Sequence, residues 1–377
     1  MTPKLKKIIY ISLVAATVII LLFLLLACLV PFLSAGRFPY IALLGLIFPI
    51  LFFIVLALFV FWCIKKSKWA FTCIVSLLLS WQQVAVVFSF HGAKKFDVHK
   101  SPGTLRVLAW NLSSWGETSW EVPRNNIDAM TGLIKNTDAD VLCFEEYLYY
   151  KDSKYRDTIV PALKEMGYQY VYFASKDYTG NFFPSLILTG TEIMSKYPIT
   201  ATGKFIYNEE DDTEPLIYAD INLNNQIIRF FTTHLESVRF GADDYAVLHN
   251  LKNPAEINIG ESRAAGGKLK IAYSKRAVQA EILHHKIEES PYPVIVCGDF
   301  NDVPSSYAYF TARGNLQDAF LKKGAGFGRT FRFISPTLRI DYILADKKFD
   351  VLQYTTFKVP YSDHYPVVAD FNICEKK

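Results

Sequence analysis

One predicted strand ends in residues that could do chemistry. The run from Pro293 to Cys297 is apolar and largely β-branched, which predicts a buried strand. Gly298 ends the run, and Asp299 and Asn301 follow on alternate positions, so both side chains would leave the strand end on the same side. A carboxylate at the mouth of a buried strand costs desolvation free energy unless it has a use. Asp299 is therefore a candidate base or metal ligand, although Gly-Asp-x-Asn is equally good turn chemistry.

Polar side chains stand at the ends of other predicted strands as well. They are Asn111, Glu146, His234, Asp341 and, just before the last strand, Asp363 with His364. One such residue alone is most often a cap, a turn or a structural histidine. If the sheets pack side by side, the set would supply oxygen ligands for a hard divalent cation, a base and two imidazoles. Their joint occurrence, rather than any one of them, indicates a functional site.

The elements that must position these residues lie between residues 104 and 377, where short apolar runs alternate with helical patterns. The expected helices are 127–135, 158–166 and 274–288, and the expected strands are 105–112, 140–146, 168–175, 186–195, 217–223, 227–234, 293–301, 339–344 and 367–371. Many strands with interspersed helices predict two packed sheets flanked by helices, an α/β class.

Residues 1–92 are expected to form a membrane region. The apolar runs at about 8–30 and 38–64 are each long enough to cross a hydrocarbon core of ~30 Å as a helix. A cleaved signal peptide would have a shorter apolar region and a small-residue cleavage site. A third run, 69–90, is interrupted by Gln82 and Gln83, so it is either a third span or a re-entrant or interfacial segment. Residues 93–103 read as a linker to a globular domain at 104–377.

Lysines set the expected topology. Three precede the first run, within residues 4–7, and three follow the second, within residues 65–68. The positive-inside rule places both groups in the cytoplasm. A third span then puts the globular domain on the extracytoplasmic side, which we favour; without it, the domain is cytoplasmic.

Charge and cysteine usage narrow the function classes. Residues 1–100 hold ten lysines and arginines against one acid, Asp97, whereas the whole chain is only +4, so the remainder is net acidic. This balance argues against strong nonspecific binding to nucleic-acid backbones, but not against a small phosphate-bearing substrate. The six cysteines show no zinc or disulfide spacing and read as buried free thiols.

The strand-end motifs, taken in order, match a family. Residues from about 104 to 373 resemble the endonuclease/exonuclease/phosphatase superfamily, whose metal-dependent phosphodiesterases and phosphatases include pancreatic deoxyribonuclease, neutral sphingomyelinases and inositol polyphosphate phosphatases. The motifs are LAWN (108–111), DVLCFEE (140–146), THL (233–235), GDFN (298–301), RIDY (339–342) and SDHYP (362–366). The resemblance implies a four-layer α/β-sandwich with its site at one edge of the two sheets. Glu145 departs from the pattern, because the family commonly has Gln there.

The resemblance also implies metal ligands. Glu146 would be the principal ligand of Mg²⁺, with Mn²⁺ as an alternative, and Asn111 would lie beside it. Asp363 would assist the metal or the histidine network. The metal would neutralise phosphoryl charge and steady the leaving oxygen.

The remaining roles belong to acid–base and phosphate-binding groups. Asp299 would orient and deprotonate the attacking water. Asn301 would hydrogen-bond the phosphate as charge builds on it. His364 would contact the phosphate while Asp341 holds its ring and favours the protonated form. His234 would serve as the acid for the leaving group.

The substrate is left open by the sequence as a phosphate ester of a lipid, nucleotide, nucleic acid or inositol phosphate. Residues 236–271, with Arg239, Arg263, Lys268 and Lys270, form either an insertion at the substrate mouth or a solvated connection. The aromatic residues 147–150 either flank the site or pack. A membrane-anchored phosphodiesterase or phosphatase is the first hypothesis, a nuclease the second and a non-catalytic membrane scaffold the third. The bilayer is the one partner expected besides substrate; no protein partner follows from the residues.

Overall fold

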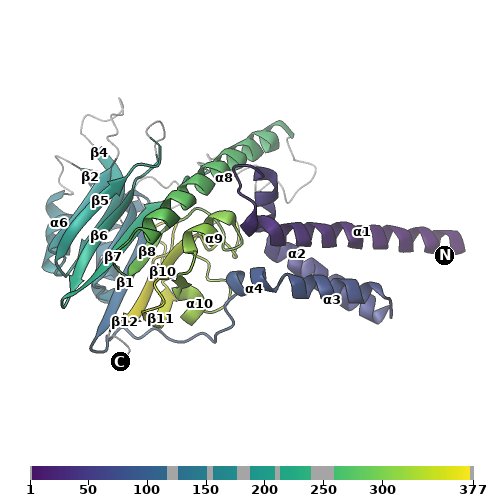
Figure 1. The fold of residues 1–377 in the computed structure, drawn as a ribbon, viewed down its shortest axis with the longest axis horizontal. Coiled ribbons are helices and arrows are strands. Elements are labelled where there is room, and N and C mark those ends of the chain that lie inside the picture. The colour runs from purple at the N-terminus through teal and green to yellow at the C-terminus, as the bar shows by residue number, and fades with distance from the viewer. Residues whose placement is uncertain are drawn as a thin grey trace. The chain divides into compact units, whose positions relative to one another are not determined.

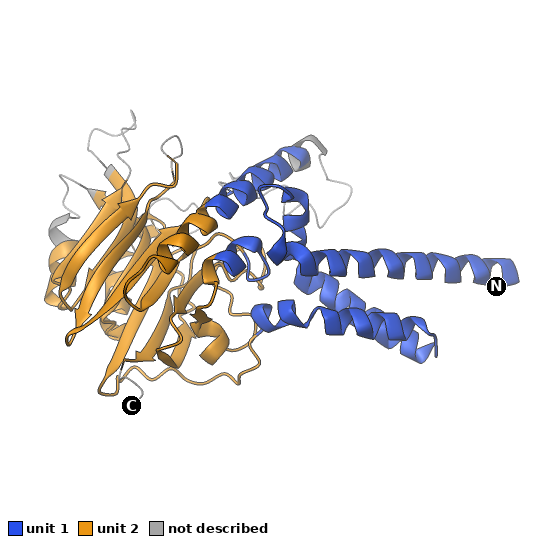
Figure 2. Cartoon of the chain, in the orientation of Figure 1, with its two compact units in different colours: residues 1–88, 238–278, 303–311 blue, residues 89–237, 279–302, 312–377 orange. Residues whose placement is uncertain are grey.

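The chain divides into two compact units. The computed structural model describes residues 2–116, 126–150, 156–175, 187–208, 213–238 and 259–373 (Figure 1). The units, coloured in Figure 2, comprise residues 1–88, 238–278 and 303–311, and residues 89–237, 279–302 and 312–377. We call them the helical unit and the sheet unit.

The sheet unit contains two mixed six-stranded sheets with the orders β11-β12-β1-β2-β4-β3 and β5-β6-β7-β8-β10-β9. The strands of the first sheet are β1 (Thr104–Asn111), β2 (Val141–Tyr150), β3 (Tyr170–Ser175), β4 (Ile187–Ser195), β11 (Asp350–Thr356) and β12 (Val367–Asn372). Those of the second are β5 (Ile199–Phe205), β6 (Leu216–Leu223), β7 (Gln226–His234), β8 (Val294–Asp299), β9 (Gln317–Asp318) and β10 (Asp341–Ala345).

Two apolar layers hold this unit together. The inner faces of both sheets share one core, which includes Val107, Cys143, Phe230 and Ile295. A second core lies between the outer face of the first sheet and the helices α5 (Ile127–Thr137) and α6 (Arg156–Glu165). The expected pair of packed sheets flanked by helices is confirmed.

The strands that the sequence pattern failed to predict are edge strands. β5, β9 and β11 each lie at the edge of a sheet. Edge strands are covered on fewer sides, so their residues need not be continuously apolar: β5 alternates between half-buried and exposed positions. The short helices α9 (Tyr307–Arg313) and α10 (Ala319–Lys323) were not expected either.

The helix expected at 274–288 is longer than its apolar pattern. α8 spans Ile259–Glu288 and therefore includes Arg263, Lys268 and Lys270, which the sequence left in a possible loop. Charged residues and a Gly-Gly pair weaken the periodic signal in its first half. Arg239 lies outside the described residues.

The helical unit begins with two long apolar helices. α1 (Pro3–Leu29) and α2 (Pro39–Ile64) are long and apolar enough to cross a membrane. They run antiparallel: Trp62 Nε1 donates to Thr17 Oγ1 at 3.1 Å, and the Trp62 ring meets the Tyr10 ring edge-on with centroids 6.0 Å apart.

The third apolar run is a bent pair of helices. α3 (Trp69–Leu79) and α4 (Trp81–Val87) meet at 53°, so the pair is either one broken span or a re-entrant segment. Ser80 stands at the break, where its hydroxyl donates to the carbonyl oxygen of Leu77 at 2.8 Å. Hydropathy indicates the apolar composition of such a segment but not its change of direction.

Candidate active site

Strand register in the second sheet aligns three of the expected site residues. β7 and β8 are parallel and pair His234 with Asp299, and β8 and β10 are antiparallel and pair Asp341 with Asp299. The three side chains therefore stand in a row across neighbouring strands. Gly298 precedes Asp299 with φ 148°, and a β-carbon at Gly298 would lie 2.2 Å from the carbonyl oxygen of Thr233, so no other residue fits there without displacing β7.

The first sheet contributes an amide and a carboxylate from the other side. β1 ends at Asn111, and the β2–β4 register shifts between Phe144 and Tyr147, which marks a bulge at Glu145 and Glu146. Glu146 takes a left-handed conformation, φ 48°. Asn111 Nδ2 donates to Glu146 Oε1 at 3.2 Å and to Asp299 Oδ2 at 3.0 Å, so this one amide joins the two sheets.

His364 and Asp341 form a buried pair. Nδ1 of His364 lies 3.0 Å from both carboxylate oxygens of Asp341, and Nε2 lies 3.5 Å from Asp299 Oδ2. Burial opposes a charge on the ring, but Asp341 and Asp299 outweigh it and hold the pKa of His364 well above 6.5. The ring is therefore protonated at neutral pH and faces Asp299 as a cation.

The loop that carries His364 is fixed by hydrogen bonds. Ser362 Oγ donates to the carbonyl oxygen of Asn111 at 2.8 Å and accepts from the backbone N–H of His364 at 3.1 Å. Trp110 Nε1 donates to the carbonyl oxygen of His364 at 3.0 Å. The end of β1 thus positions both Asn111 and the imidazole.

His234 has a carboxylate partner that strand-end reasoning missed. Its Nδ1 lies 3.4 Å from Glu214 Oε2, and its Nε2 lies 3.6 Å from Asp299 Oδ2 and 3.8 Å from Glu146 Oε1. Burial disfavours the charged ring, but the three carboxylates together raise the pKa of His234 to about 10. Glu214 precedes the start of β6 rather than following the end of a strand, so the pattern used on the sequence could not find it.

Asp299 is buried among these groups and held in one orientation. Its Oδ1 accepts from the backbone N–H of Asn301 at 2.8 Å, and its Oδ2 faces Asn111 and both imidazoles. Desolvation raises the pKa of Asp299 even though His364 and His234 pull it down. A carboxylate with a raised pKa is a stronger base than an ordinary one.

Asn301 is held beside Asp299 in a conformation that few residues adopt. Its φ is 50°, and its Nδ2 donates to the carbonyl oxygen of Leu235 at 3.0 Å. Left-handed backbone is tolerated by Asn better than by most residues, and strain of this kind concentrates at functional sites.

Glu145 points away from the site into the core. It is buried, and the hydroxyl of Thr232 donates to its Oε1. Desolvation raises the pKa of Glu145 well above 4.5, against the effect of the Thr232 hydrogen bond. The raised pKa favours the neutral carboxyl group, which has an O–H donor and an acceptor oxygen and in this respect resembles the amide of the Gln that is usual here.

The donor set suits a hard divalent cation. Glu146 is 32% exposed, and desolvation together with the charges of Asp363 and Glu214 raises its pKa to about 7, against the pull of His234 and His364. Binding of a cation would relieve the repulsion among these carboxylates. Within the described residues, the groups whose ligand atoms lie within 4.8 Å of one another are Asp299, Asp341 and His364.

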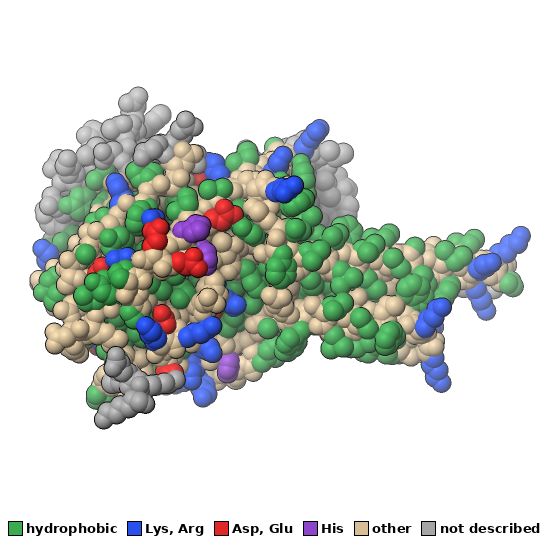
Figure 3. All heavy atoms as spheres, viewed as in Figure 1, with side chains coloured by type: hydrophobic (Ala, Val, Ile, Leu, Met, Phe, Trp, Pro, Cys, Tyr) green, Lys and Arg blue, Asp and Glu red, His purple; other side chains and the backbone are tan. Residues whose placement is uncertain are grey.

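That trio differs from the expected ligands Glu146, Asn111 and Asp363. Asp341 is already engaged on both oxygens by the His364 ring, which favours a proton-relay arrangement over a metal cage. Glu146 and Asn111 are in contact, and Asp363, whose Oδ1 accepts from Ser362 Oγ at 3.2 Å, is near enough for its charge to raise the pKa of Glu146. All eight expected residues thus lie at one edge of the two sheets. Acidic and histidine side chains gather in one place on the face seen in Figure 3.

Comparison with known proteins identifies the class. Residues 119–364 match the Endonuclease/Exonuclease/phosphatase family, and the chain belongs to that family. Its members are hydrolases that act on phosphoester bonds, and most depend on a divalent metal. Residues 6–87 match a second family, which is described only as a domain of unknown function. No curated protein sequence matches the chain.

One solved structure of low sequence identity shares the fold, and two others are similar to a lesser degree. An endonuclease/exonuclease/phosphatase from Beutenbergia cavernae DSM 12333 is 19% identical, with 71% of each chain covered and a TM-score of 0.53. The human Nocturnin catalytic domain with a bound sulfate anion is 21% identical over 71% of this chain and 93% of that one, with a TM-score of 0.49. A family member from Leptotrichia buccalis is 17% identical over 70% and 98%, with a TM-score of 0.48.

Replacing Glu214 should reduce the dependence of fold stability on His234 at alkaline pH. The charged ring stabilises the fold fully below its ordinary pKa of 6.5, and this stabilisation is lost as pH rises through about 10. Glu214→Gln removes one of the causes of the raised pKa, so the variant should be less stable than wild type at pH 8 and lose less on going to pH 10. Thermal unfolding of the metal-free full chain between pH 8 and pH 10 measures this difference in stability. Glu165→Gln, an exposed position on α6, is the control; equal pH profiles for both variants would refute the pairing.

Proposed function

We propose that this protein is a membrane-anchored, Mg²⁺-dependent phosphoesterase that hydrolyses a phosphodiester or phosphomonoester by in-line attack of water. One observation carries the proposal: the buried carboxylate Asp299 lies 3.5 Å and 3.6 Å from the Nε2 atoms of His364 and His234. A base in this position can take a proton from water. The two cationic imidazoles beside it can stabilise negative charge on the phosphate and donate a proton.

Asp299 orients and deprotonates the attacking water. Its hydrogen bonds from Asn111 and from the backbone N–H of Asn301 fix the carboxylate without neutralising it. Asn301 presents its amide beside this carboxylate and hydrogen-bonds the phosphate as charge builds there.

The two imidazoles divide the remaining work. His364, kept protonated by Asp341, holds a phosphate oxygen by a charge-assisted hydrogen bond. His234, kept protonated by Glu214, gives its proton to the leaving oxygen. Both rings are oriented through Nδ1 by a carboxylate, which leaves Nε2 as the atom that faces the reaction.

Glu146, Asn111 and Asp363 would hold the cation. When bound, Mg²⁺ supplies charge neutralisation on the phosphoryl group and on the leaving oxygen, and Mn²⁺ is an alternative. The side chain of Asn111 is fixed at both ends, because its amide nitrogen donates to Asp299 and its carbonyl oxygen accepts from the backbone N–H of Ser113 at 3.0 Å; the second lone pair of that oxygen would face the cation.

Loss of the base or of the imidazole should nearly abolish the reaction. Asp299→Ala and His364→Ala each remove a group that acts on the reacting atoms, and each should lower kcat by about 10²–10⁴-fold. The full chain is assayed with Mg²⁺ or with EDTA on plasmid, phospholipids, inositol phosphates and p-nitrophenyl mono- and diesters. Asp128→Asn, an exposed residue of α5, is the control. Near-normal Mg²⁺-dependent activity in both variants would show that the site lies elsewhere, and preferred degradation of plasmid would favour a nuclease.

Cation binding should weaken as Glu146 becomes protonated. A carboxylate with a pKa of about 7 must lose its proton before it can bind a metal, so affinity for Mg²⁺ should fall roughly tenfold from pH 8 to pH 6. Isothermal titration of the purified full chain measures the dissociation constant at each pH. In Glu146→Gln the pH dependence should disappear together with most of the affinity. A wild-type affinity that is flat across this range would remove Glu146 from the ligand set.

We further propose that residues 1–92 anchor the protein in the membrane and that catalysis, assigned to residues 104–377, occurs on the extracytoplasmic side. Positive charge within residues 4–7 and 65–68 supports cytoplasmic ends for α1 and α2, and a crossing by α3 and α4 then places the catalytic residues outside. Protease added to intact cells should digest the region after residue 92. Digestion only after the cells are permeabilised would reverse the assignment.

A further inference from the structure

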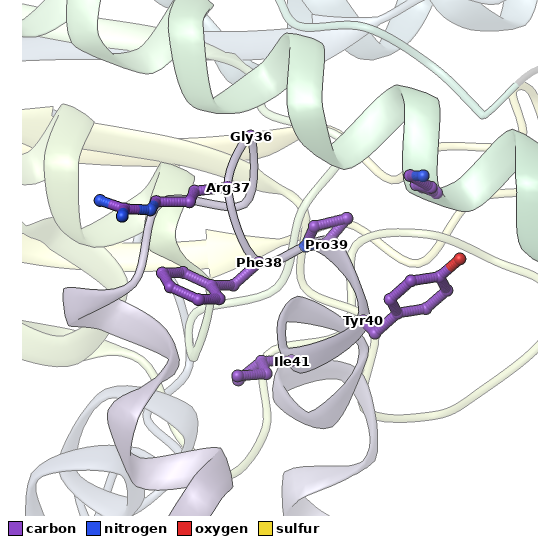
Figure 4. Close-up of a pocket in the computed structure, with 7 residues that line it drawn as sticks. Gly36, Arg37, Phe38, Pro39, Tyr40 and Ile41 are labelled. Carbon is purple, nitrogen blue, oxygen red and sulfur yellow. The ribbon is translucent and has the colours of Figure 1, made fainter.

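A pocket lies at the connection between the two long apolar helices of the helical unit, beside α8. It is lined by Gly36, Arg37, Phe38, Pro39, Tyr40, Ile41 and Lys270, and it has a volume of about 320 Å³ (Figure 4). Six of these residues are consecutive and form the α1–α2 connection and the first turn of α2. Lys270 comes from α8.

Packing within this unit brings Lys270 to the connection. Ala35 and Ala42, on either side of the pocket segment, pack against Tyr273 and Ala277 of α8. Ser274 Oγ lies 3.4 Å from the carbonyl oxygen of Ala35 and 3.0 Å from that of Lys270. These contacts fall within two turns of Lys270 on the same helix. The position of Lys270 beside the connection is therefore fixed by the packing of its neighbours.

The pocket has a cation at each of two flanks. Lys270 Nζ lies 5.6 Å from the centre of the Tyr40 ring, and Arg37 Cζ lies 5.7 Å from that of Phe38. The side chains of Arg37 and Tyr40 leave the connection in opposite directions in Figure 4. Residues 2–88 contain no Asp or Glu, and among the described residues neither cation has a carboxylate oxygen within 4.0 Å. Within the described part of the chain, neither charge is neutralised by an ion pair, which suits an anion.

The pocket lies at one end of the antiparallel helix pair. Residues 4–7 and 65–68, with their lysines, belong to the opposite end, because α1 starts and α2 finishes there. If α1 and α2 cross the bilayer, the 36–41 connection lies at the level of the lipid headgroups. Exposed aromatic side chains suit that level, and Tyr40 is 70% and Phe32 64% exposed.

We propose that this pocket binds the phosphate of an anionic phospholipid headgroup in the adjoining leaflet. Lys270 holds the phosphate from the Tyr40 flank and Arg37 adds positive charge at the other flank, while Phe38 and Tyr40 contact the glycerol and the upper acyl carbons. The site is separate from the proposed catalytic residues, and it needs no hydrolysis.

Native mass spectrometry of the full chain tests the proposal. The detergent-solubilised protein is mixed with phosphatidylglycerol or with phosphatidylcholine, and the lipid retained per chain is measured over a range of lipid concentrations. Wild type should retain phosphatidylglycerol preferentially, and Arg37→Gln combined with Lys270→Gln should weaken that binding by roughly tenfold or more. The matched control, Lys65→Gln with Lys68→Gln, removes two cations at the opposite helix ends and should keep the binding.

Three outcomes would overturn the site. They are equal losses in the pocket variant and the control, equal retention of both lipids by wild type, and displacement of the lipid by millimolar inorganic phosphate, which would indicate a free-phosphate site. If the double variant does not fold by circular dichroism, Lys270→Gln alone is measured, and it should show an intermediate loss. Phosphoesterase activity on a water-soluble substrate should be unchanged in the pocket variants, so failure of this proposal and of the proposed function are distinguishable.

Discussion

The balance of charge around Asp299 is the constraint on which the rest of the sheet unit depends. A buried carboxylate is unfavourable unless it is compensated, and here the compensation arrives from both sheets: the amide of Asn111, the backbone N–H of Asn301 and the rings of His234 and His364. The bulge at Glu146, the positive φ of Asn301 and the glycine before Asp299 are local costs that bring these groups together. Loss of any one of these partners would leave a buried charge uncompensated, which is strongly destabilising.

Strand-end residues could be predicted because side-chain direction alternates along a strand. That rule predicted that Asp299 and Asn301 leave one strand end on the same side, whereas their meeting with Asn111 and Asp341 was expected only if the two sheets pack side by side, as they do. Register between strands distant in sequence is not encoded locally, so the pairing of Asp341 with Asp299 could not be derived. Glu214 was missed because it lies in the connection before β6, outside every predicted strand, and the edge strands were missed because water on one side relaxes the need for apolar residues.

The apolar N-terminal region shows a different limit of sequence reasoning. Hydropathy depends on composition, and composition identified α1 and α2 almost to their ends. It could not tell whether the third run is straight, because the bend at Ser80 arises from backbone geometry and a single hydroxyl hydrogen bond. The side of the membrane proposed for the sheet unit depends on this one bent segment.

The alignment of His234, Asp299 and Asp341 on three adjacent strands also bears on how this enzyme can evolve. Insertion or deletion of one residue within β8 would turn Asp299 to the opposite face and break both of its pairings, and the same change within β7 or β10 would break the pairing of His234 or Asp341. Helices and loops carry no such penalty. A change of length that keeps the three side chains together is therefore tolerated in the connections around the sheets but not within these three short strands.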